Sequence, residues 1–477
     1  MTTFFICLIL LVLAYIFYGR YLERVCQIDP NAEVPSKRLY DGVDYVSLPR
    51  WRTFLIQLLN IAGVGPIFGA IMGACFGPVA FLWITLGGIF MGAMHDYISG
   101  VIILRHDGLS LPEIIGHYLG GNVRQVMRLF SIVLLVLVGV VFVLSPAGIL
   151  SNLVPAIPRL GWIVLIIIYY FIATLLPVDK VIAKIYPLFG AALIFMAIGL
   201  LWVILTGDYT VPDLTFDTLK NYQPDSNKMP IVPTLFISIA CGAISGFHAT
   251  QSPLMARCVN NEKECRQVFY GSMITESIIA LVWAAIAMAF FHGPDSLAVA
   301  LSEHGGDAGW AVNTISVTTL GVVGGVLAML GVVAAPITSG DTAFRSARLI
   351  IADIFNIEQK SIARRLMISL PLFAIGIGIT FVDFDVIWRY FAWSNQTLAA
   401  VVLWVIVCYL YRRDRNYWIA LLPAMFMTYI VTCFVFTSGQ FIGMGSTPLA
   451  YGLAGVATLV IGVIMVFKLR RDGKNRN

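Results

Sequence analysis

Three ionisable side chains lie inside long apolar segments of the chain, where charged groups are rare. His95 and Asp96 are adjacent in the run G-A-M-H-D-Y-I-S-G, and Glu276 lies in the apolar segment 268–292. An ionisable group at bilayer depth is costly and therefore usually has a function. His95, Asp96 and Glu276 are our candidates for proton binding. A structural ion pair or a cap near the helix end is the alternative for Asp96.

A polar stretch interrupts another apolar segment. Residues Ser245 to Pro253 read S-G-F-H-A-T-Q-S-P, with seven polar or helix-breaking residues in nine. The pair Ser252-Pro253 is typical of a helix start, so we predict an interrupted helix here. His248 would then lie in an unwound segment and contact a substrate or a proton. A hydrogen-bonded core histidine is the alternative.

A second interruption is predicted earlier in the chain, in N-I-A-G-V-G-P-I-F-G from Asn60. Pro66 lacks a backbone donor and disfavours helix at the preceding Gly65, so it should begin a new half-helix. Irregular backbone at bilayer depth is tolerated only where it is buried in protein or lines a cavity. The glycines that follow recur at every fourth position and favour close approach of a neighbouring helix: Gly65, Gly69, Gly73 and Gly77. A kinked, glycine-packed helix without a ligand is the alternative.

Two further polar groups could contact a ligand. In A-A-P-I-T-S-G-D, Thr338 and Ser339 could coordinate a small cation. Asp341 would neutralise it or pair with Arg345 at i+4, and a polar helix end at the cytoplasm is the alternative to a cation site. In W-S-N-Q-T, Asn395 and Gln396 could hydrogen-bond a carboxylate or an amide.

No Cys or His pair has the spacing of a zinc site, and no P-loop, nucleophile elbow or H-E-x-x-H motif occurs. We therefore predict no metal ion, no cofactor and no enzymatic activity.

Composition places the chain in a membrane. Only 12% of the residues are charged, 59% are hydrophobic, and the mean hydropathy is +0.87, whereas a soluble domain has about twice that charged fraction. The eight cysteines include no tightly spaced pair, and we expect reduced thiols. The N-terminal apolar stretch lacks a basic start and a cleavage site, so we expect an uncleaved helix. The net charge of +5 follows the loops, which predicts lipid rather than nucleic acid as a partner.

Thirteen apolar segments are long enough to span a bilayer, at roughly 20 residues each. They lie near residues 2–19, 51–76, 78–104, 128–150, 161–177, 182–206, 231–255, 268–292, 312–337, 366–383, 386–411, 416–437 and 448–467. If the N-terminus is outside, the outer loops and helix edges hold only four basic residues, Arg159, Lys220, Lys228 and Arg389. Because cytoplasmic loops carry an excess of Lys and Arg, we predict an external N-terminus and a cytoplasmic C-terminus in a bacterial-type inner membrane. An irregular linker over 20–50 and a short amphipathic helix within 107–127 would lie on the cytoplasmic side.

The two interrupted helices occupy matching positions in two sets of five helices, over residues 51–206 and 231–411. Because five is odd, the two sets run in opposite directions. Interrupted helices at matching positions of inverted halves indicate a secondary transporter with its site at the midplane. We therefore predict an all-α polytopic membrane protein with a 5+5 inverted repeat of the LeuT/APC type and two discontinuous helices. A helix and linker precede it (1–50), an external loop divides it (207–230), and two helices with a basic tail follow (412–477).

These segments resemble the carbon starvation protein A (CstA) family over roughly residues 40 to 400. The matching motifs are G-P-I-F-G-A from Gly65, F-G-P-V-A-F-L-W-I from Phe76, G-A-M-H-D-Y-I-S-G from Gly92, S-G-F-H-A-T-Q-S-P-L-M-A-R-C from Ser245, P-I-T-S-G-D-T-A-F-R-S-A-R-L from Pro336 and W-R-Y-F-A-W-S-N-Q-T-L-A from Trp388. The resemblance implies an inner-membrane importer of the amino acid–polyamine–organocation superfamily. Members are linked to peptide uptake during nutrient starvation, and some relatives to proton-coupled pyruvate uptake.

We predict alternating-access import of a small carboxylate-bearing nutrient, a peptide first and pyruvate second. The predicted substrate contacts are Asn60, Gly63, Gly65, Pro66, Ser245, Gly246, His248, Thr250, Gln251, Ser252, Asn395 and Gln396. The half-helix beginning at Pro66 would face the carboxylate. His95, Asp96 or Glu276 would carry the coupling proton, and a sodium-coupled version would use Thr338, Ser339 and Asp341. A membrane sensor that binds a nutrient without moving it is the alternative from another class, and an intramembrane enzyme is the third.

Overall fold

The computed structural model describes residues 1–42, 44–175, 178–359 and 361–474, and over these residues every regular element is a helix. A helix pairs its backbone groups internally, which a chain in lipid requires. In chain order the elements are α1 (Thr2–Ile16), α2 (Tyr18–Cys26), α3 (Pro35–Arg38), α4 (Arg50–Ile61), η1 (Gly65–Gly69), α5 (Ala70–Ala74), α6 (Val79–Leu82), η2 (Trp83–Ala93), α7 (Met94–Arg105), α8 (Leu111–Leu119), α9 (Gly121–Leu153), α10 (Arg159–Leu175), α11 (Val178–Thr206), η3 (Ile231–Leu235), α12 (Phe236–Ser238), α13 (Gly246–Ala256), η4 (Glu262–Glu264), η5 (Arg266–Gly271), α14 (Ser272–Phe290), α15 (Pro294–Glu303), α16 (Ala308–Phe355), α17 (Ile362–Ile379), α18 (Phe384–Arg412), α19 (Trp418–Thr437) and α20 (Pro448–Lys474). Elements labelled η are π-helical, except the 3₁₀-helical η4.

The chain is a multi-pass membrane protein. Within the described residues, nine helices are long and apolar enough to cross a bilayer, or up to ten if the bent pair α4 and η1–α5 forms one span. The predicted count of thirteen is therefore not reached by length and apolarity alone. The described part of α10, Arg159–Thr174, is a shorter apolar helix, and the predicted span 231–255 is divided into short helical pieces.

The predicted break before Pro66 is confirmed. Helix α4 ends at Ile61, the backbone leaves the helical conformation at Ala62, and helix resumes at Gly65 with Pro66 in its first turn. The two parts meet at an angle of 57°. A proline in the first turn costs no hydrogen bond, because the first backbone donors of a helix have no partner within it.

The second break exists, but it lies before the polar stretch and not within it. Helix α12 ends at Ser238, residues 239–245 are not helical, and α13 begins at Gly246 with Ser245 in an extended conformation. Pro253 lies inside α13, so the prediction of a helix start at Ser252-Pro253 was wrong. His248 consequently lies in the first turn of a helix and not in an unwound segment.

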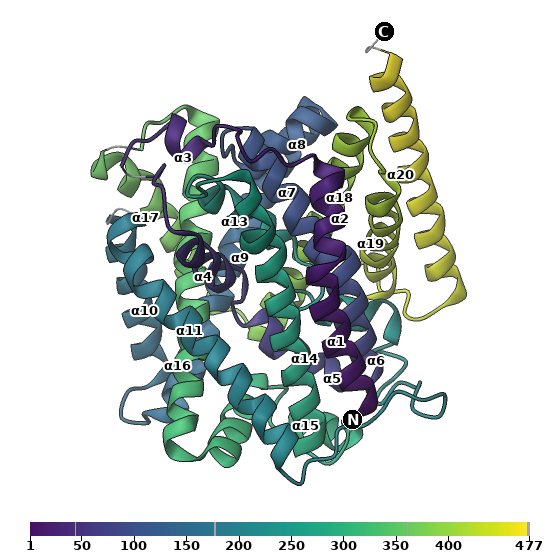
Figure 1. Cartoon of the computed structure of the whole chain (residues 1–477). Helices are drawn as coiled ribbons and strands as arrows, with labels where there is room; N and C mark the ends of the chain where they lie inside the picture. The colour runs from purple at the N-terminus through teal and green to yellow at the C-terminus, as the bar shows by residue number, and fades with distance from the viewer. Residues whose placement is uncertain (43, 176–177, 360, 475–477) are drawn as a thin grey trace.

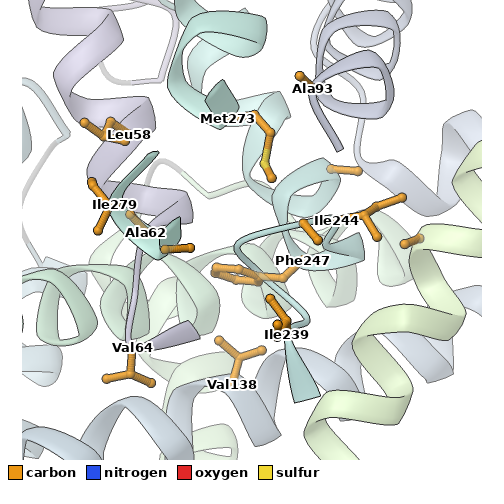
Figure 2. Close-up of a cluster of buried hydrophobic side chains, with 14 of the residues drawn as sticks. Leu58, Ala62, Val64, Ala93, Val138, Ile239, Ile244, Phe247, Met273 and Ile279 are labelled. Carbon is orange, nitrogen blue, oxygen red and sulfur yellow. The ribbon is translucent and has the colours of Figure 1, made fainter. Parts of the chain in front are cut away.

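The two broken segments pack directly against each other because glycines leave room for close approach. A Cβ atom on Gly65 would lie 2.3 Å from Sγ of Cys241, and one on Gly69 would lie 2.7 Å from the carbonyl oxygen of Ser238. A Cβ on Gly73 would meet the side chain of Ile239. The predicted glycine surface is thus confirmed for Gly65, Gly69 and Gly73, with the second break as its neighbour. Gly77 (φ 94°) lies beyond α5 and faces Tyr222 instead. Figure 2 shows apolar side chains of both segments, among them Val64 and Ile239, within one buried cluster.

Helix α16 corrects the predicted span 312–337. It begins with the Asp307 side chain accepting a hydrogen bond from the Gly309 amide, kinks at Gly321 (φ 66°), and continues to Phe355. The segment from Thr338 to Arg348 is therefore buried helix and not a helix end at the surface, and beyond it α16 becomes exposed only near Phe355. Helix α16 packs against α9, α11 and α4.

The peripheral elements agree in part with the sequence predictions. The linker over 20–50 is irregular only in part, because α2 and α3 occupy some of it. The predicted short helix within 107–127 is α8, which ends at Gly120 (φ 106°). Residues 207–230 contain no helix. The described chain begins and ends at opposite ends of the helical bundle, and α8 lies at the same end as the C-terminus (Figure 1).

Candidate functional site

A buried polar cluster forms where the second broken helix meets α7 and α14. We call it the His248 cluster and define it by five residues: His95, Asp96, Cys241, His248 and Glu276. The first two lie in the first turn of α7, Cys241 lies in the break, His248 lies in the first turn of α13, and Glu276 lies in α14. Each side chain is 1% exposed or less. The structure thus brings all three predicted proton-binding residues into one site, with His248 between Asp96 and Glu276.

Asp96 orients both histidines of the cluster. Its Oδ1 lies 2.8 Å from Nδ1 of His95, and its Oδ2 lies 2.8 Å from Nδ1 of His248. An ionised carboxylate only accepts hydrogen bonds, so each Nδ1 is the donor. His248 then presents Nε2 to Glu276, whose Oε2 lies 3.4 Å away. Among the described residues, neither this Nε2 nor either Glu276 oxygen has a hydrogen-bond partner.

Asn395 of α18 caps the N-terminus of α13. Its Oδ1 accepts hydrogen bonds from the Phe247 amide at 2.7 Å and from the Ser245 hydroxyl at 3.0 Å. This contact satisfies one of the free amide donors at the start of a helix. Gly246 permits it, since a Cβ there would lie 2.5 Å from the Asn395 carbonyl oxygen. Asn395, Ser245 and Gly246 therefore build the break in this conformation.

Replacing Asn395 with alanine is expected to lower stability by about 1–3 kcal/mol, because the buried Phe247 amide loses its acceptor. The midpoint of thermal unfolding of the purified protein in detergent measures this loss. Asn152→Ala is the matched control, because Asn152 is exposed on the rim of a cavity. Equal midpoints for wild type and Asn395→Ala would show that Asn395 does not cap α13.

Three other predicted contacts on α13 and α18 already have hydrogen-bond partners in the protein. The Thr250 hydroxyl donates to the Phe247 carbonyl at 2.6 Å, and the Ser252 hydroxyl donates to the His248 carbonyl at 3.2 Å. Gln396 donates through Nε2 to the Phe236 carbonyl at 3.1 Å. The Oε1 atoms of Gln396 and Gln251, in contrast, are buried without a hydrogen-bond partner among the described residues.

The end of α4 carries two buried amides with no hydrogen bonds. Neither the oxygen nor the nitrogen of the Asn60 side chain has a partner in the described chain, and the same holds for Gln57. The two residues are three positions apart and so lie on neighbouring parts of one helix face. A buried unpaired amide costs about 1–3 kcal/mol, which a ligand with polar groups would offset. Gln57 could have been found in the sequence, because it is a polar residue within an apolar segment and lies three positions before Asn60.

The backbone of the first break is covered by side chains in this conformation. A Cβ on Gly63 would lie 2.3 Å from the ring of Phe142, and Gly65 faces Cys241. Pro66 is fully buried. A substrate could therefore reach these backbone groups only after Phe142 or Cys241 moves.

The candidate cation residues of α16 lie next to the end of α4. The Ser339 hydroxyl donates to the Leu59 carbonyl at 2.8 Å and to the Ala335 carbonyl at 2.9 Å. Thr338 donates to the Ala334 and Ala335 carbonyls of its own helix. Asp341 lies 3.9 Å from Arg345, as an i,i+4 pair. These residues form a second polar group, which lies beside Asn60 at the end of α4.

A cavity of about 910 Å³ lies where α9 ends and α10 and α16 begin. Its walls include the charged residues Arg159, Asp307 and Asp383 and the aromatic residues Phe68 and Trp388. Its size suits a small ligand, since ligand pockets are commonly about 300–1,000 Å³.

A row of aromatic rings leads from this cavity to the His248 cluster. Phe68 lies 6.5 Å from Trp388, Trp388 lies 5.4 Å from Phe391, Phe391 lies 6.3 Å from Phe142, and Phe142 lies 5.9 Å from Phe247, measured between ring centroids. Phe247 directly precedes His248. A continuous row of packed rings therefore connects the wall of the cavity with the start of α13.

Sequence reasoning missed Cys241 as a member of the cluster. It lies in an apolar run, and its spacing from His248 matches no metal motif. Only the contact between the break and α14 places its sulfur near Glu276.

Comparison with known proteins gives a consistent picture. Residues 1–158 and 150–328 match the model of a family described as carbon starvation protein CstA. An uncharacterized membrane protein of Haemophilus influenzae is 41% identical over 351 residues, which cover 63% of this chain and 94% of that protein. Two Escherichia coli proteins also match. "Peptide transporter CstA" is 25% identical over 88% of this chain and 78% of its own length, and "Pyruvate/proton symporter BtsT" is 27% identical over 56% and 46%.

Two solved structures share the fold at low sequence identity. MhsT in complex with L-phenylalanine has a TM-score of 0.55 at 14% identity, covering 89% of this chain and 99% of that one. A manganese transporter of Eremococcus coleocola has a TM-score of 0.52 at 15% identity, covering 91% and 99%. These likenesses concern the fold alone.

Proposed function

The chain belongs to the carbon starvation protein CstA family, and we propose that it is a secondary transporter that imports a small carboxylate-bearing nutrient, a peptide in the first place. The observation that carries the proposal is the pair of broken helices packed against each other, with buried ionisable side chains at the second break. Breaks in matching helices are where secondary transporters bind substrate and coupling ion.

We propose thirteen spans with a 5+5 inverted repeat over 51–206 and 231–411. Support comes from the two breaks, each of which lies at the start of one five-helix set. The N-terminus would lie outside and the C-terminus in the cytoplasm of a bacterial inner membrane, because the loops on the C-terminal side carry nearly all the basic residues.

Substrate would bind at the first break, where Asn60 and Gln57 offer buried amides without partners. The half-helix Gly65–Ala74 begins there, and its N-terminal end favours a carboxylate. The cavity beside Phe68 and Trp388 would be the route from outside, with the aromatic row as the barrier that opens during transport.

The coupling proton would bind in the His248 cluster. Glu276, His95 and Asp96 are buried and connected in a chain, in which Asp96 contacts both histidines and His248 contacts Glu276. A proton gained or lost by one therefore changes the charge that the others face. Movement of α13 relative to α14 would change the 3.4 Å contact between His248 and Glu276 and so connect protonation to conformation.

Pyruvate is the second candidate substrate, since a relative is named as a pyruvate/proton symporter. Sodium coupling through Thr338, Ser339 and Asp341 is the alternative to the proton, supported by the contact of Ser339 with the Leu59 carbonyl next to Asn60. A nutrient sensor without transport is the candidate from another class.

Uptake of a labelled dipeptide into proteoliposomes tests the proposal. Under an inward proton gradient we expect accumulation that a protonophore abolishes and that protein-free liposomes do not show. Unlabelled pyruvate as competitor shows whether both substrates share one site. If neither substrate accumulates under a proton or a sodium gradient, although the protein binds one of them, the sensor function replaces transport.

A further inference from the structure

We propose that Cys241, His248 and Glu276 form a binding site for a divalent transition metal ion with zinc-like ligand preference. This inference goes beyond the transport function and stands on the geometry of the three side chains. One ligand atom from each, Sγ, Nε2 and a carboxylate oxygen, lies within 4.8 Å of the other two. The residues come from the second break, α13 and α14, so their proximity is a property of the tertiary structure.

The spacing is close to that of a zinc site. Two nitrogen or oxygen ligands of a tetrahedral zinc ion, at about 2.1 Å each, lie about 3.4 Å apart. Nε2 of His248 and Oε2 of Glu276 are 3.4 Å apart. A sulfur ligand at about 2.3 Å would lie about 3.6 Å from each of them. Since the sulfur lies within 4.8 Å of both atoms, each distance must shorten by at most about 1.2 Å. Gly65, which lacks a side chain, faces this sulfur and leaves it room.

The surroundings orient the ligand atoms as in known metal sites. A metal-binding histidine usually donates its other ring nitrogen to a carboxylate, which fixes its tautomer. Asp96 has this relation to His248, through the 2.8 Å contact with Nδ1. Asn395 points its Nδ2 at the Cys241 sulfur, 3.8 Å away, which favours a thiolate. Both contacts leave the ligand atoms free to face inward.

The ligand atoms of His248 and Glu276, Nε2 and both carboxyl oxygens, are fully buried and have no hydrogen bonds in the described structure. The Cys241 sulfur has two long contacts, with the Ser245 hydroxyl and with Nδ2 of Asn395, both at 3.8 Å. A thiolate and a carboxylate carry two negative charges, which a divalent cation neutralises in a buried site. The thiolate favours zinc, cobalt or cadmium over magnesium and calcium. Three protein ligands leave one coordination position for water.

Cobalt binding to the purified full-length protein tests the site directly. We expect Co²⁺ to give a tetrahedral visible spectrum together with a sulfur-to-cobalt charge-transfer band, and Zn²⁺, but not Mg²⁺, to abolish both. Cys241→Ser should lose the charge-transfer band. Cys433→Ser is the matched control, because Cys433 is equally buried but lies on α19, outside the cluster, and it should keep the band.

A second measurement keeps the proposal testable if Cys241→Ser does not fold. X-ray absorption at the zinc edge of the loaded wild-type protein should show one sulfur and a nitrogen ligand. Absence of sulfur in that spectrum, or a charge-transfer band that persists in a folded Cys241→Ser variant, overturns the site.

A transport measurement extends the test and rests on the proposed function. A bound metal and the coupling proton would occupy the same atoms of His248 and Glu276, so micromolar Zn²⁺ should inhibit dipeptide uptake by wild-type protein and by Cys433→Ser. If the cobalt spectrum shows metal binding but Zn²⁺ leaves uptake unchanged, the metal ion and the coupling proton do not compete for His248 and Glu276. Failure of all uptake would contradict the proposed function while the cobalt spectrum still decides the metal site.

Discussion

Replacing Glu276 with glutamine is expected to abolish accumulation of substrate against its gradient while exchange of substrate across the membrane continues. Glutamine keeps the size and polarity of the side chain but binds no proton. In the variant, a neutral amide replaces the carboxyl group that lies 3.4 Å from Nε2 of His248. The strength of this contact then no longer depends on whether residue 276 carries a proton. Exchange needs no net proton movement and should proceed at a rate within several-fold of wild type.

Two assays on the same proteoliposomes separate these outcomes. Net accumulation is measured under an inward proton gradient, and exchange is measured with unlabelled substrate inside and no gradient. Glu303→Gln is the control, because Glu303 is an exposed carboxylate at the end of α15 and should behave as wild type. Accumulation at the wild-type level by Glu276→Gln would remove Glu276 from the coupling mechanism and leave Asp96 and His95 as candidates.

Gly92→Ala is expected to destabilise the protein and impair uptake. A Cβ at Gly92 would lie 2.2 Å from the carbonyl oxygen of Ala243 and 2.8 Å from the side chain of Met273. The first of these atoms belongs to the backbone of the second break and cannot rotate away. Overpacking of this kind costs typically about 1–3 kcal/mol, more than the roughly 1 kcal/mol that alanine gains over glycine in a helix. To avoid the clash, the backbone near Ala243 would have to move, and this movement would displace Cys241 and His248 on either side of it.

Thermal unfolding in detergent and dipeptide uptake measure the two consequences. Gly452→Ala is the matched control: this glycine lies in α20, and a Cβ there meets no atom within 4 Å. It should unfold at or above the wild-type temperature and transport normally. If Gly92→Ala equals Gly452→Ala in both assays, η2 and the second break do not pack as closely as the structure has them.

Local properties of the sequence were enough to predict much of the fold. Low charge and long apolar runs indicate membrane helices, because lipid offers no partner for charged or unpaired polar groups. Gly63, Gly65 and Pro66 predict the first break, since proline and glycine act on the backbone at their own position. His95, Asp96 and Glu276 could be singled out for the same reason, as ionisable groups with a high cost at bilayer depth. Their roles in proton coupling remain a prediction.

Other features depend on contacts between distant segments and could not be read from local pattern. The second break lies at 239–245, although the most polar residues follow it. Gly246 to Pro253 can remain helical because Asn395 caps α13 from another helix. Helix α16 continues past Thr338, since its polar residues are covered by neighbouring helices, as the bond from Ser339 to the Leu59 carbonyl illustrates.

The same distinction holds for the site. The sequence alone identifies its ionisable residues as candidates, because their cost in lipid depends only on residue type and depth. Their relation to one another is decided by the tertiary structure: Asp96 fixes His248 from α7, and α14 brings Glu276 to the opposite ring nitrogen. Cys241, an ordinary apolar position in the sequence, joins them only because glycines let the two broken helices approach closely.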